Sequence, residues 1–246
     1  MIHAGHVHIS AGVFGILFLA WYLRKEDAGF FRLIVLQLLM AAVALLGAKL
    51  FSLALRDWQL MTPLTNELRG GWRYPGAVLA LIVATPVLVR AFLPRLKLLA
   101  FFDAYAIVFV LMHGVRRFGC VLNGCCVGGQ CSNGYCLTYP QGSVVYGHQL
   151  QQGFIPPYAE VSLPVFPLHY FFMLNALAIG VFLYWYAPRK RYDGQVLLLY
   201  LFLHEGGKAI LESFREPEVF QLQLVSLTVS FAAGMLLMLM YVNSRR

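Results

Sequence analysis

Long apolar runs separated by short polar segments dominate the chain from end to end. A helix needs about 20 apolar residues to cross the hydrocarbon core of a bilayer. Seven runs approach that length, at residues 10–23, 31–53, 75–93, 100–117, 165–187, 194–211 and 220–241. The pattern predicts an all-α, polytopic membrane protein with about seven transmembrane helices, forming a single integral membrane domain over residues 1–246.

Composition supports the membrane assignment. The 246 residues are 60% hydrophobic and 12% charged, and their mean hydropathy is +0.69, well outside the usual range of soluble domains. No Lys or Arg precedes Arg24, so the first apolar run lacks the basic start of a cleaved signal peptide and is expected to remain as a helix.

Basic residues predict the orientation, because they gather in alternate loops. Cytoplasmic loops of membrane proteins carry an excess of Lys and Arg. The clusters are Arg24, Lys25 and Arg32; Arg90, Arg95 and Lys97; Arg189, Lys190 and Arg191; Arg245 and Arg246. Seven spans then place the N-terminus and the 118–164 loop outside and the C-terminus in the cytoplasm. The net charge of +8 is explained by orientation rather than by nucleic-acid binding, since no basic patch is interleaved with exposed aromatic residues.

Two irregular regions, residues 54–74 and 118–164, are where function is expected. Backbone without regular hydrogen bonds cannot face lipid, so both regions should lie at the outer boundary or line a cavity. Eight basic residues lie outside the cytoplasmic clusters, several of them within or at the ends of spans: Lys49, Arg56, Arg69, Arg73, Arg116, Arg117, Lys208 and Arg215. The acids available within the membrane, Asp103, Glu205 and Glu212, are fewer. Ion pairs between helices explain some of the basic residues, and a lipid phosphate would balance the remainder.

All five cysteines lie within residues 119–136. Their spacing matches no standard zinc or iron–sulfur pattern, so the sequence predicts no metal and no cofactor. Cys131 and Cys136 flank the turn SNGY and are a natural disulfide pair outside the cytoplasm. The adjacent Cys125 and Cys126 are expected to point in different directions. The HAGHVH segment, with His3, His6 and His8, can bind a metal loosely, although simple exposure is the favoured interpretation.

The segment DAYAIVFVLMHGVRRFGCVLNGCCVGG, residues 103–129, resembles the signature region of the prolipoprotein diacylglyceryl transferases. Four further segments resemble motifs of that family in the same order: GAKLFSLAL, RGGWRYPGAVLALIVA, LPVFPLHYFFMLNALA and GGKAILESFREPE. The resemblance covers about residues 45–220. It implies a multi-pass enzyme of the bacterial cytoplasmic (inner) membrane that takes a diacylglyceryl group from a phosphatidylglycerol-like anionic phospholipid, with a lipoprotein precursor or another acceptor as its partner.

The resemblance also implies roles for individual residues. Arg117 matches the family's essential signature arginine, Asn123 and Gly124 its Asn-Gly pair, Glu212 a glutamate of its sixth helix, and Arg215 the arginine of its last motif. The predicted catalytic residues are Arg117, Cys125, His204 and Glu212. The predicted substrate-binding residues are Lys49, Tyr74, Arg116, Asn123, Gly124, Lys208 and Arg215.

Four positions depart from the family pattern. Pro75 stands at the position of the family's catalytic histidine, and Cys120 at that of its signature asparagine. Cys125 stands at the position of a glutamate, and Lys208 at that of a sixth-helix arginine. Cationic neighbours raise the thiolate fraction of a cysteine, so Cys125 is a candidate nucleophile or redox group, the alternative being a small residue that fits a glycine-rich turn. His204 and His113 are the candidate general bases.

Two classes of function follow. The first is a membrane transferase that passes a diacylglyceryl or related group to a thiol or other acceptor. The second is a noncatalytic phospholipid-binding or redox-sensing protein on the same fold, an alternative that the loss of the histidine favours. A transporter is less favoured, because no pair of interrupted helices marks a site at the membrane midplane.

Overall fold

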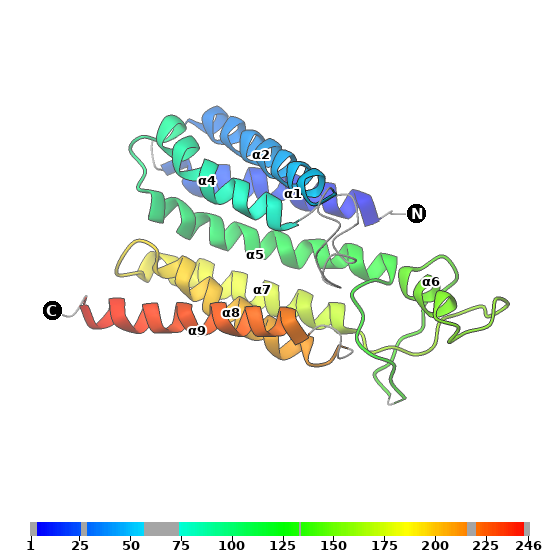
Figure 1. Cartoon of the computed structure of the whole chain (residues 1–246). Coiled ribbons are helices and arrows are strands. Elements are labelled where there is room, and N and C mark those ends of the chain that lie inside the picture. Colours follow the sequence, from blue (N-terminus) through cyan, green and yellow to red (C-terminus); the bar gives the residue numbers. More distant parts are fainter. Residues whose placement is uncertain (1–3, 26–28, 57–73, 133, 216–219, 244–246) are drawn as a thin grey trace. The chain divides into compact units, whose positions relative to one another are not determined.

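The computed structural model describes residues 4–25, 29–56, 74–132, 134–215 and 220–243. This part of the chain is helical, with isolated β-bridges as its only extended pairing (Figure 1). The helices are α1 (Ala4–Tyr22), α2 (Phe30–Arg56), α4 (Tyr74–Phe92), α5 (Leu98–Asn123), α6 (Val144–Gln151), α7 (Leu168–Tyr186), α8 (Gln195–Glu212) and α9 (Phe220–Asn243). Short 3-10 turns follow α1 at Leu23–Lys25 and α7 at Ala187–Arg189.

The prediction of an all-helical fold is confirmed, and each of the seven predicted apolar runs lies on a long helix. Four stretches of the described chain are long and apolar enough to cross a membrane: Phe30–Phe51, Leu98–Asn123, Leu168–Arg189 and Gln223–Asn243. The apolar parts of α1 and α4, Ile9–Tyr22 and Gly76–Phe92, are shorter.

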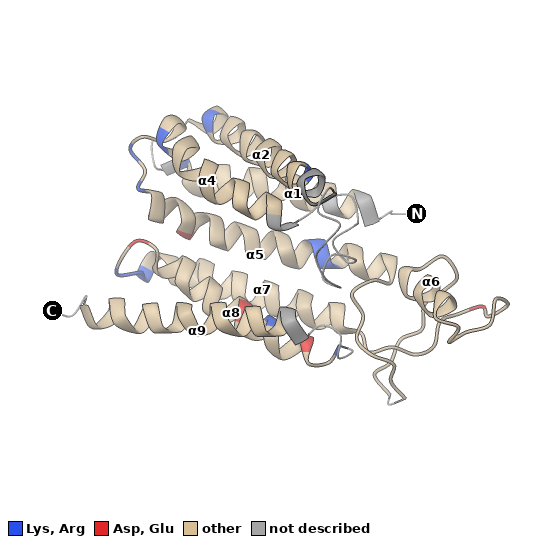
Figure 2. Cartoon of the chain, in the orientation of Figure 1, with Lys and Arg blue, Asp and Glu red and all other residues tan. Residues whose placement is uncertain are grey.

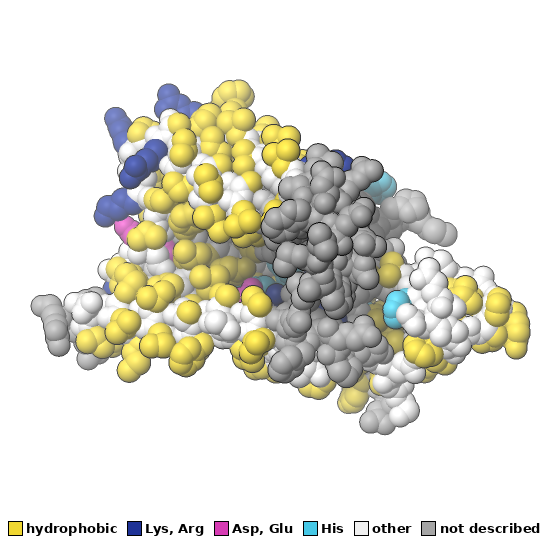
Figure 3. All heavy atoms as spheres, in the orientation of Figure 1, with side chains coloured by type: hydrophobic (Ala, Val, Ile, Leu, Met, Phe, Trp, Pro, Cys, Tyr) yellow, Lys and Arg dark blue, Asp and Glu magenta, His cyan; other side chains and the backbone are white. Residues whose placement is uncertain are grey.

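Large apolar side chains lie on the outside of these helices. Phe31, Val83, Phe231 and Met238 are each at least 70% exposed, and hydrophobic side chains cover much of the visible helical surface (Figure 3). Such a surface is rare on a soluble monomer and is what a helix presents to lipid chains.

The chain divides into two compact bodies, residues 16–101 and residues 1–15 with 102–246. In the first body, α2 and α4 approach closely at Gly47 and Gly76. A Cβ atom on Gly47 would lie 2.6 Å from the carbonyl oxygen of Gly76, so only glycine fits at this crossing. Small residues at a contact let two helix backbones pack tightly where no hydrophobic effect drives association.

In the second body, Asp103 of α5 ties the start of α8 in place. Its carboxylate is 3% exposed and accepts hydrogen bonds from the backbone N–H groups of Gly194 and Leu197, both at 2.9 Å, and from Lys190 Nζ at 2.7 Å. The first N–H groups of a helix have no partner within it, and a carboxylate satisfies both their hydrogen bonds and the helix dipole. Although burial opposes it, bonding to Asp103 and Asp193 raises the pKa of Lys190.

Two features of the 118–164 loop differ from the prediction. Helix α5 continues to Asn123, because no residue between Arg117 and Asn123 stops a helix and the first left-handed glycine is Gly124. Within the loop, Ser143 caps the short helix α6 by accepting a hydrogen bond from the backbone N–H of Tyr146 at 3.3 Å. Around α6, Tyr139, Val145 and Val165 form a small buried cluster that holds the loop together.

Candidate active site

Helix α5 ends in a turn that folds the chain back on itself. Gly124 has φ +60°, its N–H donates to the carbonyl of Val121 at 3.4 Å, and the N–H of Cys125 donates to the carbonyl of Cys120 at 3.1 Å. This pair of bonds is the Schellman motif, in which a left-handed residue closes the helix. A Cβ atom on Gly124 would also lie 2.7 Å from the ring of Tyr139. The turn therefore requires glycine, and it brings Cys125 back beside Cys120.

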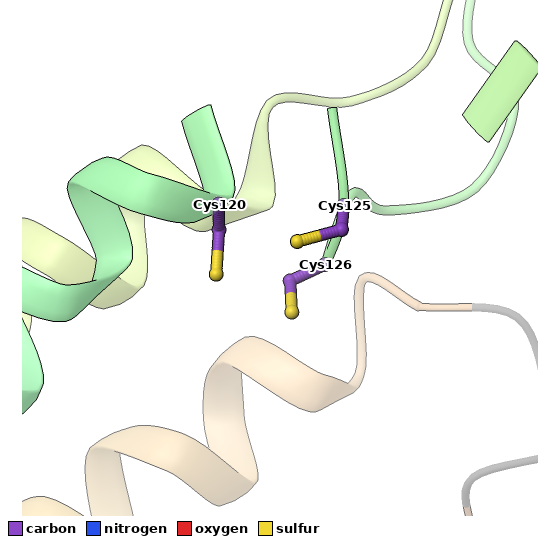
Figure 4. A group of neighbouring side chains, drawn as sticks. All are labelled: Cys120, Cys125 and Cys126. Carbon is purple, nitrogen blue, oxygen red and sulfur yellow. The ribbon is translucent and has the colours of Figure 1, made fainter. Parts of the chain in front are cut away.

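Three thiols meet at this turn. The Sγ atoms of Cys120, Cys125 and Cys126 all lie within 4.8 Å of one another, and their side chains lie next to one another (Figure 4). Cys126 has φ 57°, the only left-handed backbone among the described residues other than glycine. The side chains of Cys125 and Cys126 extend in different directions in Figure 4, yet their Sγ atoms remain close, and both thiols are free.

Electrostatics differ among these thiols. Hydrogen bonds from Cys120 and Cys125, together with the nearby charges of Arg117 and Arg215, hold the pKa of the Cys126 thiol well below its usual range. Hydrogen bonds with Cys120 and Cys126, together with burial, raise the pKa of Cys125. The shift therefore favours the thiolate form at Cys126, the residue that follows the predicted Cys125. The remaining two cysteines, Cys131 and Cys136, form a disulfide with their Cα atoms 6.0 Å apart.

Arg117 lies one helical turn before Cys120 and is held by two rings. Its Nε–H donates to Nε2 of His113 at 3.1 Å, and its guanidinium lies 4.6 Å from the centre of the Phe172 ring of α7. Because Nε2 of His113 accepts this bond, His113 is neutral with its proton on Nδ1. Among the residues that the structure describes, no carboxylate lies within ion-pair distance of Arg117.

His204 of α8 faces His113 across the helix contact. The two rings lie edge to face with centroids 5.1 Å apart, and His204 stacks on Tyr200 at 5.2 Å. His204 is 4% exposed, and its Nδ1 atom has no hydrogen-bond partner in the described part of the chain. The structure thus brings both candidate bases together beside Arg117.

Two ion pairs form along and just after α8, each between residues three positions apart. Lys208 Nζ lies 3.5 Å from Glu205, which also accepts a hydrogen bond from Ser226 of α9 at 2.7 Å. Glu212, 7% exposed, pairs with Arg215 at 3.1 Å. Charged residues are otherwise sparse along α7, α8 and α9 (Figure 2). Lys208 and Arg215 each pair with one acid, whereas Arg117 pairs with none in the part of the chain that the structure describes.

Two glycines, Gly128 and Gly129, allow the loop to pack closely against the end of α8. Gly128 and Gly129 donate backbone hydrogen bonds to the carbonyls of Phe166 and Phe214, at 2.8 and 3.2 Å, and a Cβ atom on Gly128 would lie 2.8 Å from the Phe214 oxygen. Beside this contact is a pocket of about 140 Å³ whose lining includes Arg215. The close approach explains why the stretch after the cysteines is Gly-Gly.

The remaining predicted residues lie at exposed helix positions, in the other compact body, or outside the described part of the chain. Arg116 and Asn123 are exposed on α5. Lys49 is exposed on α2 and belongs to the other compact body, as does Tyr74, the first residue of α4, whose side chain falls outside the described residues together with that of Pro75. His6 is exposed, whereas the side chains of His3 and His8, with Arg69 and Arg73, also fall outside the described part.

Sequence reasoning missed two residues of the site. Tyr139 Oη and His169 Nε2 are 2.9 Å apart and joined by a hydrogen bond, and burial raises the pKa of Tyr139 to about 12. His169 is fully buried, and its Nδ1 atom has no partner among the described residues. A histidine at the start of an apolar helix was the available signal, since such a residue needs a polar partner.

The sequence comparison agrees with this arrangement. The model of the family described as prolipoprotein diacylglyceryl transferase matches residues 3–243, nearly the whole chain. Comparison with curated protein sequences finds no match. With a family match of this extent, carried on apolar helices that meet at a cationic centre, the chain belongs to the prolipoprotein diacylglyceryl transferase family, a family of membrane transferases of lipoprotein biosynthesis.

Proposed function

We propose that the protein is an enzyme of the bacterial inner membrane that transfers a diacylglyceryl or related group from a phosphatidylglycerol-like lipid to a thiol acceptor, such as a lipoprotein precursor. Family membership supports the reaction class. The observation that carries the proposal is the Arg117 guanidinium near the end of α5, which has no carboxylate partner among the described residues. It is held by His113 and Phe172 and lies within electrostatic reach of the Cys120 and Cys126 thiols. A planar guanidinium binds phosphate oxygens through two parallel hydrogen bonds.

In this scheme, Arg117 binds the lipid phosphate and stabilises the charge that develops as glycerol phosphate leaves. Preorganised donors aimed at a developing charge supply a large share of catalytic rate in many enzymes. Lys208 and Arg215 add positive charge nearby while Glu205 and Glu212 hold them in position. His204 is the better general base, because the accepting nitrogen of His113 is already occupied by Arg117.

Seven spans with the N-terminus outside remain our proposal for the topology. Supporting it are the helices on all seven apolar runs and the alternation of basic clusters, which places Arg189, Lys190 and Arg191 on the cytoplasmic side. The cysteine cluster and the disulfide then lie on the outer side, where disulfides persist.

The test is release of glycerol phosphate from labelled phosphatidylglycerol in proteoliposomes, with and without a lipobox peptide. We expect release that depends on the peptide and falls about 100- to 1,000-fold in Arg117→Ala. Arg189→Ala is the matched control, because Arg189 also stacks on an aromatic ring, 4.1 Å from the centre of Trp185, but at the other end of α7. Equal loss in both variants, or no release with any acceptor, would count against the proposal.

A noncatalytic lipid-binding or redox-sensing role is the second candidate. The observation in its favour is the contact among three thiols, any two of which can join as a disulfide. Lipid binding that needs Arg117, without release of glycerol phosphate, would support this alternative.

A further inference from the structure

We propose that Cys120, Cys125 and Cys126 together bind a zinc ion through three thiolates, leaving a fourth position open for the acceptor thiol. The metal site stands on the geometry of the cluster alone, whereas its use in catalysis rests on the proposed transferase function. The proposal departs from the prediction of no metal, which considered cysteine spacing and could not include the turn that gathers the three side chains.

The size of the cluster fits one ion. Zinc–sulfur bonds are about 2.3 Å long, so two thiolates on a tetrahedral zinc are separated by roughly 3.8 Å. The three Sγ atoms already lie within 4.8 Å of one another, and Figure 4 shows the three side chains next to one another at the end of α5. A shift of a few tenths of an ångström per side chain would complete the coordination.

The backbone places these ligands before any ion binds. Hydrogen bonding between the N–H of Cys125 and the carbonyl of Cys120 closes the turn, and Gly124 allows it. Cys126 is held at φ 57°, a conformation that a residue with a side chain rarely adopts and that persists where function or surroundings require it. This strained residue is the one that adds the third sulfur, which is the arrangement expected of a built ligand site.

The number of ligands favours an open zinc site. Soft thiolates select zinc or cuprous copper over magnesium, calcium or manganese. Zinc is four-coordinate, and three protein ligands with one open position are typical of catalytic rather than structural sites. The group contains three residues, with no fourth Cys, His, Asp or Glu among the described residues joining it.

Nearby side chains can balance the net charge of a zinc–thiolate cluster and contact a bound acceptor. Three thiolates and one Zn²⁺ carry a net charge of −1, and Arg117 and Arg215 both lie within electrostatic reach of Cys126. The fully buried His169 also lies within electrostatic reach of Cys126, and its unpartnered Nδ1 atom calls for a polar group that the described residues do not supply.

At the position of the family's catalytic histidine this chain has Pro75. We propose that the zinc ion takes over the role of that histidine, which is to activate the acceptor thiol. A thiol that coordinates zinc loses its proton. The zinc-bound acceptor sulfur attacks the glycerol carbon of the donor lipid, a carbon–sulfur bond forms, and the carbon–oxygen bond to phosphate breaks. Glycerol phosphate departs with the bonding electrons beside Arg117, while the acceptor proton passes to solvent. No electrons are gained or lost from outside the two substrates.

The test is metal content of the purified full chain in lipid nanodiscs by inductively coupled plasma mass spectrometry. We expect about one zinc per chain, lost in Cys120→Ser and in Cys126→Ser. The matched control is the double variant Cys131→Ser with Cys136→Ser, which removes two cysteines of the same loop and should retain zinc. Since a variant can lose metal by misfolding, the wild-type chain is also stripped and reloaded with Co²⁺, which should give intense thiolate-to-cobalt absorption in the near ultraviolet.

The outcomes separate the metal site from the proposed function. Absence of zinc and of the cobalt band, a disulfide between any two of the three cysteines in the purified chain, or copper in place of zinc would overturn the inference. Zinc binding without glycerol phosphate release would leave the metal site intact and refute the transferase. Release that continues at the same rate after zinc is removed would refute the catalytic role of the ion while supporting the transferase.

Discussion

The two ends of the pair formed by α5 and α8 differ in how many of their polar and charged groups have partners. At one end, buried Asp103 accepts three hydrogen bonds and pairs with Lys190, so each charge and each helix N–H that it contacts is satisfied. At the other end, Arg117 has no carboxylate partner among the described residues, His204 and His169 each have an unpartnered nitrogen, and Cys126 adopts a strained backbone. Complete pairing identifies the first end as structural, whereas the unsatisfied groups of the second indicate a site for a ligand.

The largest effect on stability should come from the paired end. Asp103→Ala removes the partner of Lys190 and of two backbone N–H groups, so we expect the free energy of unfolding to fall by roughly 2–4 kcal/mol. The measurement is thermal or denaturant unfolding in detergent. Donor-lipid affinity per folded molecule should be unchanged, because the described partners of Asp103 are Lys190, Gly194 and Leu197, at the end of α5 opposite Arg117. A large loss of affinity in the folded fraction would show that the two ends are coupled.

Disrupting the Gly124 turn, at the other end of α5, should cost less stability. Gly124→Ala puts a side chain on a residue at φ +60° and against the Tyr139 ring, which should destabilise the protein by about 1–3 kcal/mol. Because the turn positions Cys125 and Cys126, the three thiols should react faster with a maleimide probe. Gly134→Ala is the control, since a Cβ atom there would meet nothing within 4 Å. Unchanged thiol reactivity in Gly124→Ala would mean that the cluster does not depend on the turn.

The seven helices could be predicted from hydrophobicity because each apolar run is long and its polar ends are clear. The site could be predicted only in part. Arg117, His204, Glu212 and Arg215 followed from charge in an apolar setting and from the family's motifs. The meeting of the three cysteines did not, since it depends on a left-handed backbone at Cys126, which propensity disfavours and spacing does not encode. Tyr139 and His169 are 30 positions apart, so their hydrogen bond required the folded loop.

A third prediction concerns the positive charge of Lys208 at the open end of the α5–α8 pair, the end that contains Arg117. Lys208 shares Glu205 with Ser226, and its ammonium is a point charge where the family motif has an arginine. Lys208→Gln should weaken donor binding about tenfold, and Lys208→Arg should restore or exceed the wild-type affinity. Equilibrium binding of phosphatidylglycerol in nanodiscs measures both. Identical affinities in all three proteins would remove Lys208 from the lipid site and leave Arg117 as its main cation.

The smallest expected effect is the contribution of Lys190 to the pH dependence of stability. Folding raises the pKa of Lys190 above its ordinary value of 10.5, because the hydrogen bonds with Asp103 and Asp193 outweigh the opposing effect of burial. A group whose pKa is raised by folding stabilises the protein fully below its unfolded pKa and loses that contribution as the pH rises through the folded value. The midpoint of unfolding should therefore stay level from about pH 8 to 10 and fall more steeply above the lysine range in the wild type than in Lys190→Met. The side chain of Lys190 is 26% exposed, so solvent screening keeps the difference small. Lys208→Met, at the open end, should retain the wild-type dependence, because Lys190 remains in place. If the two methionine variants respond alike, the Asp103–Lys190 pair is not the titrating element, and the stability of the paired end rests on the cap that Asp103 provides to α8.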